Sequence, residues 1–229
     1  MESSIIQIEP KLGEGIFLIK DVAKILHLNY AKTYRWIVGY WGSGLDENIR
    51  YTFGEIDNRA INFLSLIEFY TFFKLREKGV SSVQIKRLHN ELSQVLSTRY
   101  PFAKAQDIYV EGRKTKKTIK KFIYYNYLDS LIKLDKKHQF YLSFMENFLE
   151  KIEFDDNNFA VRFFPLENSK NVVVDPKHQF GQPVINGTNI KTQTIFSLYK
   201  GGETLEDISI LYNLSKDKVE DAIIFQKAA

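Results

Sequence analysis

The sequence predicts an α+β fold that is mainly helical and has three consecutive parts. Residues near both ends of the chain have apolar side chains at helical spacing, with capping residues before them. Residues in the middle of the chain are rich in β-branched and aromatic side chains on either side of polar turns, which is typical of hairpins. We therefore expect an N-terminal winged helix-turn-helix domain at 1–103, a middle hairpin and helix segment at 104–166, and a C-terminal three-helix domain at 167–229.

Composition excludes several classes of protein. The chain has 229 residues, of which 44% are hydrophobic and none is cysteine. This length and apolar content favour two or three compact units over disorder. The absence of cysteine excludes disulfides, cysteine zinc sites and thiol catalysis. Residues 1–15 lack a signal-peptide pattern, and polar side chains interrupt the most apolar run, 61–73, so we expect a cytoplasmic protein with no membrane partner.

Residues 16–37 have the pattern of two short helices joined by a turn. Apolar side chains gather on one face of the first helix, at Val22, Ala23, Ile25 and Leu26. After a break at 27–29, Asn29 is suited to cap a second helix over 30–37. Because Ala23 is small, the two helices can cross closely, as they do in a helix-turn-helix.

The rest of the N-terminal part is predicted as a wing followed by two longer helices. Glycines end the preceding pattern, at Gly39, Gly42 and Gly44. The run 49–53 is expected to form one side of the wing. A long apolar helix is predicted from Ile56 to Lys78, with Gly79 as its left-handed C-cap. Ser81 or Ser82 would cap the next helix. The buried side of that helix should hold Val83, Leu88, Leu92 and Val95.

The middle of the chain is expected to contain two hairpins and a helix. The first hairpin is predicted to turn at 111–114, and the second at Asp155–Asn158. Between them, residues 138–152 have the spacing of an amphipathic helix. A short strand over 171–176 follows the second hairpin.

Three helices are predicted towards the C-terminus. Thr188 or Thr192 is expected to begin the first helix, Thr204 starts a capping box, and Ser215 precedes the last helix. The spacing of these positions is typical of a second helix-turn-helix.

A glycine-rich stretch, 180–190, connects the last strand to these helices. It is a poor phosphate loop, because Pro183 and the neighbouring apolar residues favour an extended link. We interpret Gly181 and Gly187 as turn positions that need unusual backbone angles, and Pro183 and Thr188 as structural residues of the same turn.

The sequence offers no catalytic or metal-binding constellation, so we predict no enzyme activity, no metal and no cofactor. The four histidines are scattered, and no two of them lie at helical spacing. A solvated turn explains Asp155 and Asp156 better than acid–base chemistry does. The near repeat of 135–140 at 175–180 is interpreted as coincidence, because the flanking residues do not match.

The first helix pair is basic, which favours contact with nucleic acid. From Lys20 to Trp36 there are four basic residues and one acidic residue, a balance of +3. Basic and polar side chains on such helices reach phosphates or base edges. The candidate DNA-binding residues are Lys24, Lys32, Thr33, Tyr34 and Arg35. An ordinary basic surface helix is the alternative interpretation.

The C-terminal helices have the opposite charge. From Glu203 to Asp221 there are six acidic residues and two lysines, a balance of −4. Phosphate would repel a helix with this charge, so we expect the segment to bind protein, either a second copy of the chain or a basic partner. A purely structural role is the alternative.

A basic run in the middle segment is a further candidate for binding. Residues 111–121 contain six basic residues and one glutamate. The basic residues are Arg113, Lys114, Lys116, Lys117, Lys120 and Lys121. They are suited to an acidic protein surface or to nucleic acid, and a solvated hairpin tip is the alternative interpretation.

Two stretches of the chain resemble known families. LIKDVAKILHLNYAKTYRWI, followed by RYTF and FYTFFKLREKGVSSVQIKRL, resembles the MerR-like winged helix-turn-helix. VVVDPKHQFGQPVINGTNI and the helices after it resemble a small domain of unknown function, with its Gly-x-Pro-x-x-x-Gly-Thr-x-Ile run. With YPFA and RFFPL between them, the two resemble a subgroup of VapB-type antitoxins over nearly the whole chain. Residues 104–150 are the least distinctive.

This resemblance implies an antitoxin of a type II toxin–antitoxin pair. Such a protein would bind and neutralise a PIN-like ribonuclease toxin, and would repress its own operon by binding operator DNA as a homodimer or higher homo-oligomer. The resemblance places Lys32, Thr33, Tyr34 and Arg35 on the DNA-reading helix and Arg50 on the wing. Many members of the family that the C-terminal part resembles have arginine after the Gly-Thr pair, where this chain has Asn189.

Two other functions remain open from the sequence. One is a stand-alone MerR-like transcriptional regulator that senses a small apolar ligand through the aromatic residues of 122–128 and 140–148. The other is an interaction scaffold without a role on DNA.

Overall fold

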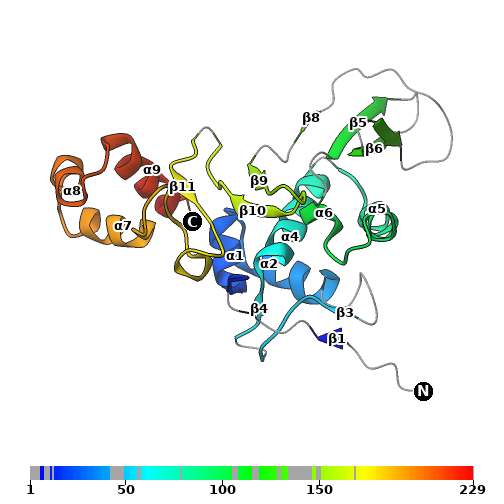
Figure 1. Ribbon diagram of the computed structural model, residues 1–229, viewed down its shortest axis with the longest axis horizontal. Coiled ribbons are helices and arrows are strands. Elements are labelled where there is room, and N and C mark those ends of the chain that lie inside the picture. The colour runs from blue at the N-terminus through cyan, green and yellow to red at the C-terminus, as the bar shows by residue number, and fades with distance from the viewer. Residues whose placement is uncertain are drawn as a thin grey trace. The chain divides into compact units, whose positions relative to one another are not determined.

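The computed structural model describes residues 6–7, 11, 13–41, 49–55, 58–77, 79–104, 108–114, 119–127, 130–133, 146–147, 151–167 and 169–228. Its backbone combines helices with small sheets, in agreement with the predicted α+β class (Figure 1). Contacts divide the chain into two compact units, 1–66 with 161–229 and 67–160. The first unit therefore contains residues from both ends of the sequence.

The first unit begins with short strands, two helices and a π-helical turn. After β1 (Ile6–Gln7) they are β2 (Phe17–Leu18), α1 (Ile19–Ile25), α2 (Tyr30–Tyr34) and η1 (Arg35–Trp41). The predicted cap of the second helix is confirmed, because Oδ1 of Asn29 accepts a hydrogen bond from the backbone N–H of Lys32 at 3.1 Å. The break expected at Gly39 is wrong, because η1 continues α2 through this glycine.

Two further short strands pair with the N-terminal ones. β3 (Ile49–Arg50) lies parallel to β1, and β4 (Ala60–Ile61) lies antiparallel to β2. Phe53 and Ala60 form another antiparallel bridge, so the chain doubles back between them. The buried rings of Phe17 and Phe63 lie 6.5 Å apart and join β2 to the start of the next helix.

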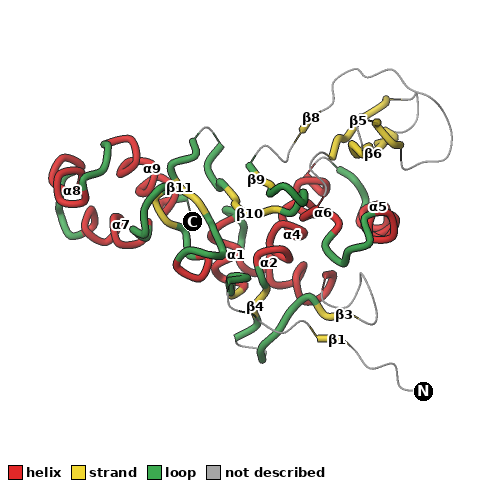
Figure 2. Tube along the Cα trace, in the orientation of Figure 1, coloured by secondary structure: helices red, strands yellow, loops and turns green. Residues whose placement is uncertain are grey.

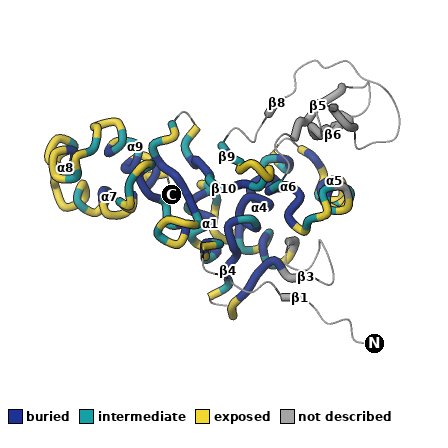
Figure 3. Tube along the Cα trace, viewed as in Figure 1, coloured by how far each residue is buried: buried dark blue, intermediate teal, exposed yellow. Residues whose placement is uncertain are grey.

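Helix α4 (Phe63–Glu77) is buried around most of its circumference, as the dark blue segment in Figure 3 shows. The predicted start at Ile56 is wrong, because Ala60 and Ile61 belong to a strand. The helix begins after Asn62, whose Oδ1 accepts a hydrogen bond from the backbone N–H of Ser65 at 2.9 Å. The predicted end is confirmed by Gly79, which has φ of +77°.

Helix α5 (Ser82–Val95) begins at the predicted cap. Oγ of Ser81 accepts a hydrogen bond from the backbone N–H of Gln84 at 3.3 Å. Leu88 and Leu92 are buried as predicted. Val83 is 69% exposed, so its predicted burial is wrong. It lies in the first turn of the helix, on the side that faces solvent.

The second unit buries a carboxyl group beside α6 (Pro101–Lys104). Glu68 is fully buried, and its Oε1 accepts a hydrogen bond from the backbone N–H of Ala103 at 2.9 Å. Its Oε2 lies 3.1 Å from Nε2 of His89. Burial raises the pKa of Glu68, and this effect exceeds the opposing effect of the hydrogen bonds.

A four-stranded antiparallel sheet follows in the second unit. In the order β7–β6–β5–β8 its strands are Ser130–Lys133, Ile119–Tyr127, Ile108–Lys114 and Glu146–Asn147. The predicted hairpin is confirmed, but its turn is not at 111–114, because these residues pair with β6. The helix predicted at 138–152 is wrong where the structure describes it, because β8 pairs with β5 and Ile152 begins another strand. The other residues of 138–152, apart from the turn residue 151, lie outside the described residues.

Short strands lead the chain back into the first unit. They are β9 (Ile152–Phe154), β10 (Ala160–Phe163), β11 (Val172–Val173) and β12 (Val184–Ile185). The predicted turn before β10 is confirmed, because Oδ1 of Asp155 accepts hydrogen bonds from the N–H groups of Asn157 and Phe159. A bridge between Phe163 and Val174 connects β10 to the antiparallel pair β11–β12.

Three helices complete the first unit, as predicted. They are α7 (Thr192–Lys200), α8 (Leu205–Tyr212) and α9 (Lys216–Lys227), drawn as red segments joined by green turns in Figure 2. The predicted cap at Thr204 is confirmed by its hydrogen bond from the backbone N–H of Asp207 at 3.1 Å. The buried core between the helices and β12 consists of Ile185, Ile195, Ile208, Val219, Ala222 and Ile223.

Candidate functional site

Two helix pairs in the first unit are built in the same way. We call residues 18–37 the N-terminal helix pair and residues 204–223 the C-terminal helix pair. In each pair the first helix is followed by a residue with left-handed backbone, His27 or Asn213, with φ of 52° in both. The next residue is a leucine whose N–H bonds a carbonyl of the first helix, at 2.8 Å in the N-terminal pair and 2.9 Å in the C-terminal pair. Both pairs therefore have the same turn.

The buried positions of the two pairs also correspond. The carbonyl that closes each turn belongs to a small buried residue, Ala23 or Ser209. Three more equivalent positions are buried in both pairs, namely Val22 and Ile208, Thr33 and Val219, and Ile37 and Ile223. The two pairs differ mainly in the side chains that they expose to solvent.

The second helix of the N-terminal pair exposes basic and aromatic side chains. Arg35 is exposed, and Nζ of the half-buried Lys32 lies 4.6 Å from the ring centre of Trp36. The ring of Tyr34 lies 6.1 Å from that of Tyr30, which is 54% exposed. Cationic and planar groups thus share one helix, which is a suitable combination for phosphates and base edges.

Three further predicted DNA-binding residues have other surroundings in the fold. Thr33 is fully buried and its Oγ1 donates to the carbonyl of Asn29 at 3.0 Å, so its expected contact with DNA is wrong. Nζ of Lys24 donates to Oε1 of Gln193 at 3.2 Å, and desolvation lowers the pKa of this lysine. Arg50 lies in β3, which pairs with β1.

The C-terminal pair exposes acidic and apolar side chains instead. Nζ of Lys216 donates to Oε1 of Glu206, and this hydrogen bond lowers the pKa of the exposed Glu206. Ile210 and Leu211 are 80% and 67% exposed on α8, which is largely yellow in Figure 3. The position equivalent to Leu211 is Ile25, which is 1% exposed. One position is therefore core in one pair and surface in the other.

The N-terminal pair contacts the C-terminal helices inside the first unit. The ring of His27 lies edge-on to that of Phe225, with 5.4 Å between centres, and its Nδ1 lies 3.2 Å from the carbonyl oxygen of Ala228. The hydrogen bond from Lys24 to Gln193 adds a second link, from α1 to α7. A change at the C-terminal helices can thus reach the turn of the N-terminal pair through direct contacts.

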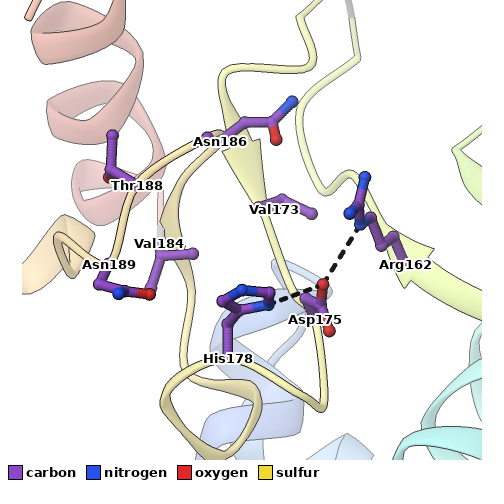
Figure 4. A pocket seen from close by; sticks show the side chains of 9 residues that line it. Arg162, Val173, Asp175, His178, Val184, Asn186, Thr188 and Asn189 are labelled. Atoms are coloured by element: carbon purple, nitrogen blue, oxygen red, sulfur yellow. Dashed lines mark hydrogen bonds and ion pairs between the residues drawn. The ribbon is translucent and has the colours of Figure 1, made fainter.

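A polar pocket of about 350 Å³ lies beside the C-terminal helices (Figure 4). Arg162 of β10, Asp175 after β11 and His178 in the following turn contribute charged or titratable groups. Asp175 is buried, and its Oδ2 lies 3.2 Å from Nε of Arg162 and 3.0 Å from Nδ1 of His178. The carboxylate therefore holds two side chains from different segments in place.

The glycine-rich stretch forms the opposite wall of this pocket. Gly181 has φ of +86°, and a Cβ there would lie 2.3 Å from the ring of Phe17, so no other residue fits without rearrangement. Gly187 has φ of +82° with open space around it. Oγ1 of Thr188 donates to the carbonyl of Ile185 at 2.8 Å, which fixes the turn.

Pro183 anchors the other end of this stretch. Its carbonyl accepts hydrogen bonds from the N–H and the Oγ1 of Thr192, at 3.0 and 3.2 Å. Asn186 and Asn189 from the same stretch are among the residues that line the pocket. The stretch thus connects β12 to α7 and lines a cavity at the same time.

Sequence comparisons match this chain to one family profile and to two known proteins. A family profile described as a protein of unknown function, DUF433, matches residues 172–225, which include the pocket loop and the C-terminal helix pair. The chain is 30% identical over 80 residues to the protein named "Putative antitoxin VapB45" of Mycobacterium tuberculosis, which is 34% of each chain. It is 36% identical over 56 residues to the uncharacterized protein Rv2308 of the same organism, 24% of each chain. The chain thus matches about a third or less of the length of these relatives.

A solved structure supports the fold over a longer stretch. The crystal structure of Rv2018 from Mycobacterium tuberculosis superposes with a TM-score of 0.64 at 16% identity, covering 95% of this chain and 100% of that one. At this identity the likeness establishes the fold alone. The sequence matches, and not this structure, indicate an antitoxin-like family.

The basic run of the second unit is spread over two strands. Arg113 and Lys114 lie in β5, and Lys120 and Lys121 lie in β6. Arg113 is directly opposite Lys120, whereas Lys121 is opposite Gly112. The described part of the run is therefore divided between two paired strands. Lys116 and Lys117 lie outside the described residues.

Sequence reasoning missed the three central residues of the pocket. The sequence pattern places Arg162 in a hairpin, and Asp175 and His178 lie in the near repeat that the flanking residues indicate to be a coincidence. One feature of the sequence could have indicated the pocket. Asp175 and His178 lie three residues apart, directly after a predicted strand. In the described part of the chain no group of three or more acidic or histidine side chains could hold a metal ion. No helix in that part is both long and apolar enough to cross a bilayer.

Proposed function

We propose that this protein is the antitoxin of a type II toxin–antitoxin pair and represses its own operon by binding DNA. The observation that carries the DNA-binding part is the exposed basic and aromatic surface of the N-terminal helix pair, set on a capped turn of helix-turn-helix type. The similarity to the relative named as an antitoxin supports the other part over a third of the chain.

In this proposal, α2 is the DNA-reading helix and the N-terminal helix pair is a MerR-like winged helix-turn-helix. Lys32, Tyr34 and Arg35 contact DNA, and the chain that doubles back between Phe53 and Ala60 serves as the wing, with Arg50 near its base. Thr33 supports the helix from within. A homodimer would present two such helices to an operator with two half-sites.

The toxin is proposed to be a PIN-like ribonuclease with an acidic metal site. The basic run of the second unit has the complementary charge for such a site. Replacing its six basic residues by alanine should weaken toxin binding strongly. Unchanged binding by this variant would exclude the run and leave the exposed apolar residues of α8 as the next surface to test.

Co-expression with the product of the adjacent gene tests the proposed function. We expect the neighbouring protein to arrest growth when produced by itself, and this chain to restore growth and to co-purify with it. Absence of both effects, with DNA binding retained, would contradict the antitoxin role. That result would favour the stand-alone transcriptional regulator instead.

A further inference from the structure

We propose that the pocket formed by Arg162, Asp175, His178 and the glycine-rich stretch binds a carboxylate group. Its lining combines a charged cluster on one wall with two side-chain amides on the other (Figure 4). Cavities of roughly 300 to 1,000 Å³ with a few placed polar groups are the usual form of small-ligand sites. With about 350 Å³, this pocket lies at the lower end of that range and suits a small group.

Asp175 holds the wall of the pocket in place and does not itself bind the ligand. Its side chain is 8% exposed, whereas those of Arg162 and His178 are 41% and 49% exposed. Its Oδ1 accepts the backbone N–H of Lys177 at 2.8 Å, and its Oδ2 lies within hydrogen-bond distance of both partners. The negative charge is thus enclosed by donors, and Arg162 and His178 are the more exposed members of the cluster.

His178 presents its second ring nitrogen to a ligand. A carboxylate only accepts hydrogen bonds, so the Nδ1 that faces Asp175 carries the proton. Nε2 is then the ring nitrogen that lies away from Asp175. The histidine is therefore oriented by the buried carboxylate, as a ligand-binding imidazole requires.

The lining offers an anion one guanidinium and several hydrogen-bond donors. Arg162 is part of the lining, and the Asp175 carboxylate beside it already accepts from the backbone N–H of Lys177. The amides of Asn186 and Asn189 can supply further hydrogen bonds from the opposite wall. Behind this wall, Lys218 donates to the carbonyl of Asn186 at 3.0 Å and keeps the loop in place. A monoanionic carboxylate fits this lining better than a doubly charged phosphate.

Two sources could supply the carboxylate: a small free organic acid, or an acidic side chain of a partner protein. The test uses the full-length chain and two probes, acetate and the blocked peptide acetyl-Gly-Glu-Gly-amide. Nuclear magnetic resonance would follow the side-chain amide signals of Asn186 and Asn189 and the ring signals of His178, with chloride at equal ionic strength as the control. We expect saturable shifts at these signals with acetate, with the peptide or with both.

The two probes distinguish the sources. Binding of acetate with exclusion of the peptide assigns the pocket to a small acid, and tighter binding of the peptide assigns it to an acidic protein segment. Failure of both probes to give saturable shifts would overturn the proposal. Neither outcome depends on DNA or on a toxin, so the proposed function is tested separately.

Isosteric variants make the test specific. Asn189→Asp adds a negative charge to an exposed pocket residue and should weaken binding about tenfold or more. His178→Gln should also weaken binding, because it removes the ring that Asp175 orients at the pocket. Asn213→Asp makes the same chemical change at an exposed turn outside the pocket, and should leave the affinity unchanged. Equal affinity of wild type and Asn189→Asp would also overturn the proposal.

Discussion

The N-terminal and C-terminal helix pairs have the same turn and the same buried positions but opposite surfaces. His27 and Asn213 take the same left-handed conformation, and a leucine closes the turn in both. The first pair carries a balance of +3 around its helices and the second a balance of −3. Backbone geometry in this protein is therefore set by a few local positions, while the solvent-facing positions are free to serve different partners.

The most informative difference is between Ile25 and Leu211, which occupy the same position. Ile25 is 1% exposed and Leu211 is 67% exposed. The neighbouring position shows the same trend, because Lys24 is half-buried and hydrogen-bonded whereas Ile210 is 80% exposed. The N-terminal pair is thus packed on this side within the first unit, and the C-terminal pair has an uncovered apolar side.

The largest expected effect is the loss of the buried side chain in the N-terminal pair. Ile25→Ala should destabilise the first unit by ~2–5 kcal/mol, because it leaves a cavity. Leu211→Ala should change stability by less than ~0.5 kcal/mol in the isolated chain, because the side chain is already exposed. Urea unfolding followed by tryptophan fluorescence measures both, since Trp36 and Trp41 lie in the first unit. Equal losses of stability in Ile25→Ala and Leu211→Ala would show that the two positions do not differ in burial.

A smaller effect is expected at the caps of the two second helices. Asn29→Ala should cost ~1 kcal/mol, because its side chain accepts a backbone hydrogen bond at the start of α2. Ser215→Ala should cost less, because the side chain of Ser215 makes no capping hydrogen bond. The same unfolding measurement compares them. A larger loss for Ser215→Ala would contradict the difference in capping.

The smallest effect concerns the ion pair that the C-terminal pair has at its surface. The hydrogen bond from Lys216 lowers the pKa of Glu206 in the folded state, so its stabilising contribution is present above the unfolded carboxyl pKa and is lost as the pH falls through the folded value. Lys216→Ala should therefore be slightly less stable than wild type at neutral pH and equal to it in acid. Exposed pairs of this kind contribute little.

The N-terminal pair provides the control for this pH dependence. Tyr30 occupies the position of Lys216, and Lys20 that of Glu206, so no carboxylate titrates there. Tyr30→Ala should differ from wild type by an amount that does not change between neutral and acidic pH. If the stability difference between Tyr30→Ala and wild type changed with pH as much as that of Lys216→Ala, the pH dependence could not be assigned to the pair of Lys216 and Glu206.

Local features of the fold were predictable from sequence because they depend on neighbours in the chain. The caps at Asn29, Ser81 and Thr204 and the end at Gly79 follow from side chains within three or four residues of the groups they satisfy. The start of α4 was not predictable in the same way. There, pairing of β4 with β2 overrides the helical spacing of an apolar run.

The candidate pocket was not predictable, because its residues come from separate segments. Arg162 reaches Asp175 only because the bridge between Phe163 and Val174 places β10 beside β11. Periodicity contains no information about this pairing. Thr33 shows the opposite limit, since it lies in a run with the basic residues Lys32 and Arg35 while its own side chain is buried. Charge patterns identify a surface but do not identify each member of it.

The slope of DNA affinity against salt concentration tests the central contrast between the two helix pairs most directly. The measurement compares wild type with Lys32→Ala/Arg35→Ala and with Asp217→Ala/Glu220→Ala, using the DNA upstream of the gene. We expect the N-terminal variant to bind more weakly and to lose about one unit of slope for each phosphate contact removed, while the C-terminal variant keeps the wild-type slope. The same slope in all three proteins would contradict this expectation.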